Sequence, residues 1–280
     1  PDVDDDGILD GEEVFYALDP LDPRDALNDN DGDRIPNVYE LRNGMDFNFS
    51  EDPLTGSALI VDPLMGAGYT HTAINAAVDS LTQDYQIILV RDGVYDESPD
   101  FPSDYRFLIL SENGPQKTII RGTLNLNNNF LFAVRSKVAV DGFTLSPQDA
   151  DVYSILDVHA GAEGSVFRRM IVTGQNGGYR TFYITADDVT LERSIIASYT
   201  ATFSVFYSSG AQNLSLNHVT IARNNIGEIS AHLFSLRSFS SINVENSIIW
   251  GETVENSQIY VDGSSSFAQS DSVIIGGYGG

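Results

Sequence analysis

Short apolar strands, each interrupted by a two-residue polar break, recur at a near-constant interval over the second half of the chain. Six such units align, at residues 140–145, 167–172, 191–196, 216–221, 244–249 and 269–274. Their successive starts differ by 27, 24, 25, 28 and 25 residues. A unit of this size cannot enclose a core of its own. The period therefore predicts a solenoid whose coils stack and bury their apolar positions against one another.

Each unit also contains an earlier apolar strand, which gives three short strands per coil. These earlier strands are 154–158, 181–184, 204–207 and 258–261. The pattern resembles the right-handed parallel β-helix of the pectin-lyase-like superfamily, and the resemblance covers the chain from about residue 63 onward. We therefore expect an all-β fold for residues 51–280, a right-handed parallel β-helix with a short N-terminal capping helix.

The two ends of the predicted solenoid differ. Before the first coil, residues 72–78 read as an amphipathic helix that would cover the apolar end, as in the proteins that the solenoid resembles. At the other end, the apolar run 272–275 is followed by the glycine-rich residues 276–280. We expect this end to be covered by that tail, by further sequence or by another molecule. One consequence would be head-to-tail self-association into a homo-oligomer or filament.

Charge divides the chain into two parts. The 280 residues carry 15 Lys and Arg against 40 Asp and Glu, a net charge of −25, and no Cys. Residues 1–62 alone hold 18 acids and three arginines. This balance argues against binding to nucleic acid or anionic membranes. The longest apolar runs are too short to span a bilayer, so we expect no membrane insertion. Because the chain begins at Pro1, we expect a trimmed, secreted product.

The spacing of acids near the N-terminus predicts a calcium-binding loop. Alternate carboxylates at the first, third and fifth positions precede a glycine, and a glutamate at the twelfth position would close the shell with two oxygens. A backbone carbonyl at position seven and an acid at position nine would complete the ligands. These candidates are Asp2, Asp4, Asp6, Ile8, Asp10 and Glu13.

A second run has the same spacing but a different sixth residue. Arg34 stands where glycine is expected, so we predict that this loop turns differently or binds more weakly. Its candidate ligands are Asp29, Asp31, Asp33, Ile35, Asn37 and Glu40. A solvated acidic segment remains the alternative for both loops.

Prolines in the stretch between the two loops disfavour paired EF-hands. Tandem acidic loops joined by Asp-Pro linkers resemble thrombospondin type 3 repeats, common in bacterial surface proteins, over about 40 residues. In such repeats neighbouring loops share ions, which makes Asp19, Asp22 and Asp25 secondary candidates. We assign residues 1–50 to this calcium-binding segment, with Ca²⁺ as the expected ion.

Candidate catalytic groups are sparse. A polysaccharide lyase of this fold would need a basic residue near calcium-binding acids, yet Lys117 and Lys137 lie outside acidic clusters of their repeats. Arginines recur at one corner and could bind uronate carboxylates, but pairing with acids on the same corner is the stronger explanation. These residues are Arg168, Arg169 and Arg193, with Asp141 and Glu192 as the acids.

Other polar groups have simpler explanations. Asp187 and Asp188 could be paired glycosidase acids, but their position before a strand is typical of a turn. The four histidines, His71, His159, His218 and His232, lack the spacing of metal ligands, and we interpret them as structural or surface residues.

We therefore expect no catalytic residues and a protein that is not an enzyme. The favoured interpretation is a calcium-stabilised structural or adhesive β-helix at the cell surface, self-assembling head to tail. Two alternatives stay open: a polysaccharide lyase or hydrolase acting on acidic glycans, and a carbohydrate-binding module of a larger surface protein that binds extracellular glycans.

Overall fold

The computed structural model describes most of the chain. The described residues are 1–46, 48, 50, 58–101, 104–122, 130–148, 153–174, 179–197, 200–201, 203–222, 225–226, 232–250 and 259–275. The glycine-rich residues 276–280 lie outside these ranges. Among the described residues, no helix is both long and apolar enough to cross a bilayer.

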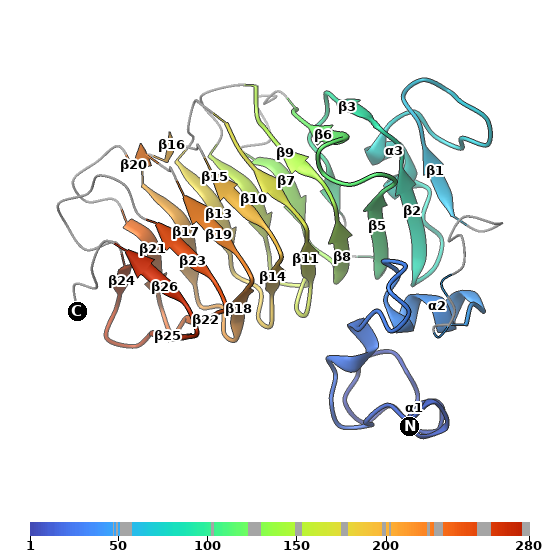
Figure 1. Ribbon diagram of the computed structural model, residues 1–280, viewed down its shortest axis with the longest axis horizontal. Coiled ribbons are helices and arrows are strands. Elements are labelled where there is room, and N and C mark those ends of the chain that lie inside the picture. Colours follow the sequence, from blue (N-terminus) through green and yellow to red (C-terminus); the bar gives the residue numbers. More distant parts are fainter. Residues whose placement is uncertain are drawn as a thin grey trace.

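Parallel strands form the three walls of a solenoid whose axis lies horizontally in Figure 1. Each strand pairs with the equivalent strand of the next coil. The nine-stranded sheet contains β1 (Leu59–Val61), β2 (Gln86–Val90), β5 (Phe107–Ser111), β8 (Val138–Asp141), β11 (Val166–Arg168), β14 (Thr190–Glu192), β18 (Leu214–Asn217), β22 (Ser241–Glu245) and β25 (Ser266–Ser270).

The other two walls follow the same order along the axis. The seven-stranded sheet contains β4 (Asp100–Phe101), β7 (Phe130–Val134), β10 (Ser154–Val158), β13 (Arg180–Ile184), β17 (Ser204–Ser209), β21 (His232–Arg237) and β24 (Ile259–Val261). The eight-stranded sheet contains β3 (Gly93–Tyr95), β6 (Thr118–Ile120), β9 (Thr144–Leu145), β12 (Ile171–Val172), β15 (Ile195–Ala197), β19 (Thr220–Ala222), β23 (Ile248–Trp250) and β26 (Val273–Ile275). A small pair, β16 (Thr200–Ala201) and β20 (Asn225–Ile226), lies beside them.

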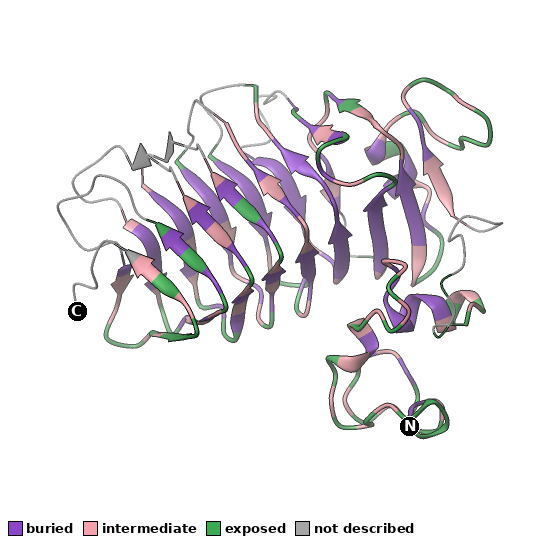
Figure 2. Ribbon diagram, viewed as in Figure 1, coloured by how far each residue is buried: buried purple, intermediate pink, exposed green. Residues whose placement is uncertain are grey.

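This architecture confirms the predicted all-β right-handed parallel β-helix. Its walls enclose one continuous apolar core, visible as the buried strands of Figure 2. Aromatic rings stack along that core, with the rings of Phe182 and Phe206 4.4 Å apart and those of Phe206 and Phe234 5.1 Å apart. Such stacking follows from parallel register, which places equivalent side chains of successive coils directly above one another.

The expected capping helix is α3 (Ile74–Asp79), slightly later than the predicted range. Its buried face consists of Ile74, Ala77 and Val78, which join the solenoid core at its first coil. At the other end, β25 is largely exposed and Val273 of β26 is 54% exposed.

The acidic N-terminal segment, residues 1–46, folds into α1 (Asp10–Tyr16), a 3-10 helix (Asp25–Leu27) and α2 (Asn37–Asn43). We call this segment the leader. In Figure 1 it lies beside β2, β5 and β8. A second apolar cluster joins the two parts, with Ile8 and Ile35 from the leader and Ile87 and Leu108 from the nine-stranded sheet. The leader covers the outer face of β2, so this strand is buried on both faces, which accounts for its continuous apolar sequence.

Polar contacts fix the leader further. Tyr39 donates a hydrogen bond through its hydroxyl to the carbonyl of Phe107 at 2.9 Å. Arg168 donates from Nη2 to the carbonyl of Leu27 at 2.6 Å. The leader therefore has a defined position on the solenoid.

Candidate functional site

Carboxylates of the first predicted loop converge in the structure. Oxygens of Asp2, Asp4 and Asp6 lie within 4.8 Å of one another, and so do oxygens of Asp6, Glu13 and Asp25. Asp25, a secondary candidate in the sequence, comes from the 3-10 helix and joins this loop rather than the linker. Gly7 adopts a φ of 103° at the sixth position, which favours glycine.

Several of these oxygens are buried without a hydrogen-bond partner among the described residues. Both carboxylate oxygens of Glu13 and both of Asp4 are in this state, and the Glu13 residue is 0% exposed. A buried, unpaired carboxylate is costly unless a cation neutralises it. Converging carboxylate oxygens are the ligands that calcium prefers, so these residues fit a calcium ion.

The second loop brings together oxygens of Asp29, Asp31 and Asp33. Arg34 has a φ of 87°, close to the left-handed conformation of Gly7. The first alternative, that this loop turns differently, is therefore wrong, because arginine adopts the strained conformation at the sixth position. Weaker binding of the ion stays a prediction. Contacts with the solenoid hold it there: Arg34 donates from Nη1 to the carbonyl of Glu112 at 3.1 Å.

The other predicted ligands lie elsewhere or play different parts. Asp10 accepts a hydrogen bond from the Val3 N–H, and Asp22 pairs with Arg24. Asp19 forms a turn, accepting a hydrogen bond from the Leu21 N–H. The Asn37 side-chain oxygen accepts one from the Asn30 N–H. The side chains of Ile8 and Ile35 are in the apolar cluster, which leaves their carbonyls as the possible ligand groups, and Glu40 is 1% exposed with one unpartnered oxygen.

Burial and neighbouring acids raise the pKa values of the carboxyl groups in these loops. Burial, reinforced by Asp31 and other acids, raises the pKa of Glu40 to about 8. The same causes raise the pKa of Glu13 to about 7, and burial raises that of Asp6 to about 6. Metal-free protein therefore has to ionise these close carboxylates as the pH rises toward 8, at a cost in stability.

Metal-free protein is expected to lose stability as the pH rises from about 5 to 8. A raised pKa in the folded state means that the folded protein binds more protons than the unfolded chain across this range, so the free energy of unfolding falls with pH. Thermal melting in EDTA at several pH values measures the effect. Melting in millimolar calcium is the control, since ionised carboxylates are the better ligands. A melting temperature in EDTA that is constant or rises would contradict the prediction.

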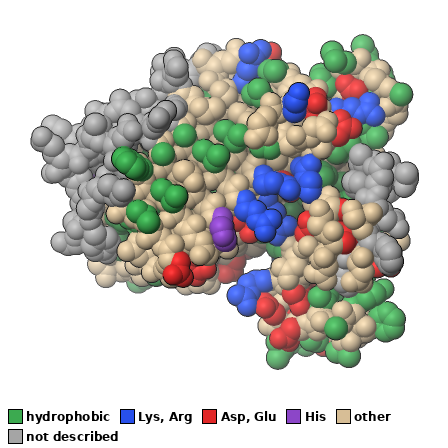
Figure 3. Space-filling model, in the orientation of Figure 1, with side chains coloured by type: hydrophobic (Ala, Val, Ile, Leu, Met, Phe, Trp, Pro, Cys, Tyr) green, Lys and Arg blue, Asp and Glu red, His purple; other side chains and the backbone are tan. Residues whose placement is uncertain are grey.

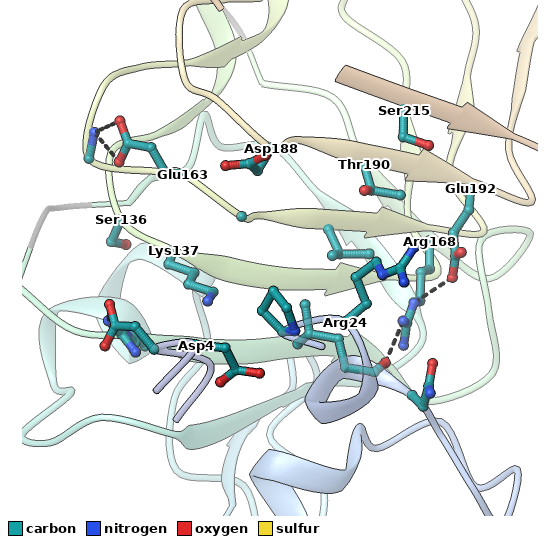
Figure 4. Close-up of a pocket in the computed structure, with 18 of the residues that line it drawn as sticks. Asp4, Arg24, Ser136, Lys137, Glu163, Arg168, Asp188, Thr190, Glu192 and Ser215 are labelled. Atoms are coloured by element: carbon teal, nitrogen blue, oxygen red, sulfur yellow. Dashed lines mark hydrogen bonds and ion pairs between the residues drawn. The ribbon is translucent and has the colours of Figure 1, made fainter. Parts of the chain in front are cut away.

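A groove of about 890 Å³ lies between the leader and the outer face of the nine-stranded sheet (Figure 4). Lys137, Arg168 and Glu192 line it, and Nε of Arg168 lies 2.6 Å from Oε1 of Glu192. Burial, followed by repulsion from Arg106, lowers the pKa of Lys137. The sequence placed Lys137 outside an acidic cluster, but folding brings the leader beside it.

Aromatic and cationic side chains line the outer face of the seven-stranded sheet. Parallel register aligns Asp157 with Tyr183, and Tyr183 with Tyr207. The guanidinium of Arg180 lies 3.8 Å from the centre of the Tyr207 ring, and that of Arg237 lies 4.9 Å from the Tyr260 ring. We call these residues, with His159, the tyrosine face. Arginine and tyrosine together can bind a sugar ring and its carboxylate.

One acid and one histidine lie side by side on the tyrosine face. Asp157 is 6% exposed, accepts a hydrogen bond from the Ser154 hydroxyl, and has Oδ2 3.6 Å from Nε2 of His159. The His159 ring is half-buried and contacts the edge of the Tyr183 ring, 6.2 Å between centres. A buried carboxylate beside an imidazole can orient that ring as a proton acceptor.

The remaining candidates are turn or surface groups. Asp187 accepts a hydrogen bond from the Gln212 N–H, and Asp188 accepts one from the Asn213 side chain. Both acids therefore link adjacent coils at a turn. His71 contacts the Thr70 hydroxyl at 2.9 Å.

Comparison with known proteins gives a fold but no family. No protein-family model matches the chain, and no curated protein matches it. Among solved structures, pectin methylesterase from carrot matches 80% of this chain and 85% of its own, with 17% identity and a TM-score of 0.51. A pectin methylesterase from Aspergillus niger matches 80% of this chain and 88% of its own, with 14% identity and a TM-score of 0.47. The chain thus has the pectin-lyase-like β-helix fold.

One expectation needs correction. The sequence suggested a protein that is not an enzyme, because no catalytic cluster was visible along the chain. This expectation is contradicted: pectin methylesterase from carrot, a solved structure that shares the fold, is an enzyme. The physical reason for the error is that parallel strands about 25 residues apart place their side chains on one face, so a group of side chains from several coils is not visible along the chain.

Proposed function

We propose that the protein is an extracellular, calcium-binding hydrolase that removes ester groups from acidic polysaccharides at the tyrosine face. The observation that carries this proposal is the pair of Asp157 and His159, set among arginines and tyrosines on one wall. It replaces the structural or adhesive interpretation. Activity on acidic glycans, left open as an alternative by the sequence, accords with the fold shared with pectin methylesterases.

The chemistry favours an ester over a glycosidic bond. Glycosidases need two available carboxyl groups. Among the described residues aligned along the tyrosine face, the other acid is Asp100, which pairs with Arg135. Asp157 and His159 therefore form an acid and imidazole pair rather than two free carboxylates.

In the proposed reaction, His159 takes a proton from water as that water attacks the ester carbonyl carbon. Asp157 orients the ring and stabilises the imidazolium that forms. The tetrahedral intermediate then collapses, the bond to the alkoxide oxygen breaks, and the imidazolium returns its proton to the leaving alcohol. Arg237 would hold the carboxylate of a neighbouring sugar, since guanidinium groups bind carboxylates through paired hydrogen bonds. Arg180, which is 8% exposed, would hold the tyrosine rings that contact the sugar.

The experiment that tests this function follows the products of highly methyl-esterified pectin, polygalacturonate and alginate in millimolar calcium. Release of methanol from pectin, without new reducing or unsaturated ends, is expected. Chain cleavage without alcohol release would contradict the ester assignment. No product from any polymer would contradict hydrolysis altogether.

A second candidate reaction is elimination in the groove, favoured by the lowered pKa of Lys137. A neutral amine removes the proton at carbon 5 of a uronate, and the electron pair forms the 4,5 double bond and expels the oxygen at carbon 4. That oxygen leaves as a hydroxyl group once it takes a proton from the ammonium that has formed. This reaction would be supported if wild type forms unsaturated products, detected by their ultraviolet absorbance, and Lys137→Met does not. Methanol release unchanged in Lys137→Met is the result expected from the tyrosine-face proposal.

We also propose that the leader binds calcium as a thrombospondin type 3-like segment that stabilises its contact with the solenoid. The converging, unpartnered oxygens of the first loop support this assignment. Head-to-tail self-association remains a separate proposal, supported by the exposed β25 and β26 at the last described coil. Electron microscopy and light scattering with and without calcium would test it, and monomers under both conditions would contradict it.

A further inference from the structure

One corner of the solenoid carries a column of residues in the left-handed conformation. This corner lies between the nine-stranded and eight-stranded sheets. The first residue after each strand of the nine-stranded sheet from β8 to β25 has a positive φ, from 47° to 85°. The column consists of Gly142, Arg169, Arg193, His218, Asn246 and Asp271.

Arginine is an unusual occupant of such a position. The N–H of Arg169 donates to the carbonyl of Glu192, and that of Arg193 donates to the carbonyl of Asn217, so the backbone forms the same ladder on each coil. Gly142 forms an equivalent bond without a side chain. The turn itself therefore does not need arginine.

This corner has more arginines than acidic side chains that pair with them. Arg169 donates from Nε to Asp141 at 2.7 Å, and Arg168 pairs with Glu192. These pairs agree with the charge-pairing alternative for those two arginines. Arg193, however, is exposed and has no ion pair with any residue in the described part of the chain.

A further arginine lies at this corner. Nη2 of Arg34 is 3.7 Å from Oδ1 of Asp141, the acid that Arg169 also contacts. The Arg34 Nε is buried without a hydrogen-bond partner among the described residues. Two arginines therefore share one carboxylate.

Two cavities meet at the corner, with volumes of about 480 and 580 Å³, and both are lined by Arg169 and Arg193. The first also has an apolar side formed by Ile171, Ile195 and Pro115, and Ile195 is 46% exposed. Figure 3 shows Lys and Arg side chains gathered near the centre of this face, with hydrophobic side chains beside them. The first cavity thus offers cations and an apolar surface without an acid in its lining, whereas Asp29, Asp141 and Glu192 also line the second.

We propose that this arginine corner is a binding site for an anionic sugar, specifically a uronate unit of an acidic polysaccharide. The guanidinium of Arg193 binds the carboxylate, and the apolar side contacts the ring. Screening confines the repulsion of the −25 protein to about 8 Å at physiological salt, so local cations determine binding. The site lies on a different wall from the tyrosine face and does not depend on the proposed hydrolysis.

Isothermal titration with trigalacturonate in constant millimolar calcium tests this proposal. Arg193→Gly removes the guanidinium and suits the left-handed backbone, so the variant is expected to fold. The control variant is Arg121→Ser. It removes an equal charge directly after β6, where Arg121 pairs with Asp96. Wild type and Arg121→Ser are expected to bind at the corner, whereas Arg193→Gly loses that site or binds there about tenfold more weakly.

The number of trigalacturonate-binding sites distinguishes this proposal from the proposed hydrolase activity. Two sites in wild type and one in Arg193→Gly indicate that both the tyrosine face and the corner bind. One site in wild type and none in Arg193→Gly supports the corner and contradicts binding at the tyrosine face. Unchanged number and affinity in Arg193→Gly would overturn the corner site, as would equal binding of a neutral maltotriose.

Discussion

Glutamine in place of Glu13 is expected to remove most of the stabilisation that calcium gives to the wild-type protein. At a calcium concentration 100 times the dissociation constant, one site adds about 2.7 kcal/mol to the free energy of unfolding. Glu13 supplies two buried, unpartnered oxygens next to Asp6 and Asp25, and glutamine keeps its volume but loses its charge. Differential scanning calorimetry with calcium and with EDTA measures the difference.

The same variant is expected to be more stable than wild type without metal at pH 8. Burial raises the pKa of Glu13 to about 7, so the wild-type group must ionise in a buried site, whereas glutamine stays neutral. At pH 5 the two proteins should be similar in EDTA. Glu163→Gln, at an exposed turn, is the control and should behave as wild type in both conditions. A calcium response that persists in Glu13→Gln would contradict the assigned ligand.

Replacing His159 by asparagine is expected to lower kcat for ester hydrolysis by about 100-fold or more, with little change in KM. General base catalysis contributes 10²–10⁴-fold in typical enzymes, and His159 is the proposed base. Asp157→Asn should lower kcat as well, because an amide would favour the wrong tautomer of the imidazole. Initial rates of methanol release from pectin measure both effects.

His71→Asn provides a matched control, since His71 contacts Thr70 near β1 and lies off the tyrosine face. Its rates should equal those of wild type. Circular dichroism and melting temperature check that each variant is folded. If His159→Asn retains wild-type kcat, hydrolysis does not proceed by the proposed base.

The solenoid could be predicted because its signal is local and repeated. Every coil breaks its strands with two polar residues, and the structure shows the cause: the second residue, for example Arg193 or Asn246, has a left-handed backbone. The acidic loops were also visible as spacing, since their ligands are neighbours in the chain. Arg34 was harder to interpret, because contacts with the solenoid determine its backbone conformation.

Most of the tyrosine face could not be predicted in the same way. Asp157 and His159 are neighbours in the chain, but Tyr183 and Tyr207 lie on other coils, and only the register of parallel strands aligns them with Asp157. One feature of the sequence indicates that the leader packs on the solenoid. It is the continuous apolar run of β2, which is typical of a strand buried on both faces. Asp25 lies beside the carboxylates of the first loop because the leader folds back on itself, and the spacing of the acids does not show this.

Hydrogen exchange with and without trigalacturonate tests the central claim, that acidic glycan binds at the tyrosine face, most directly. The claim predicts slower exchange in peptides that contain β10, β13, β17 and β21 of wild type in calcium. Arg180→Ser should lose this protection while keeping any protection at the arginine corner. Protection confined to the groove beside Lys137, or none in the seven-stranded sheet at saturating ligand, would contradict the claim.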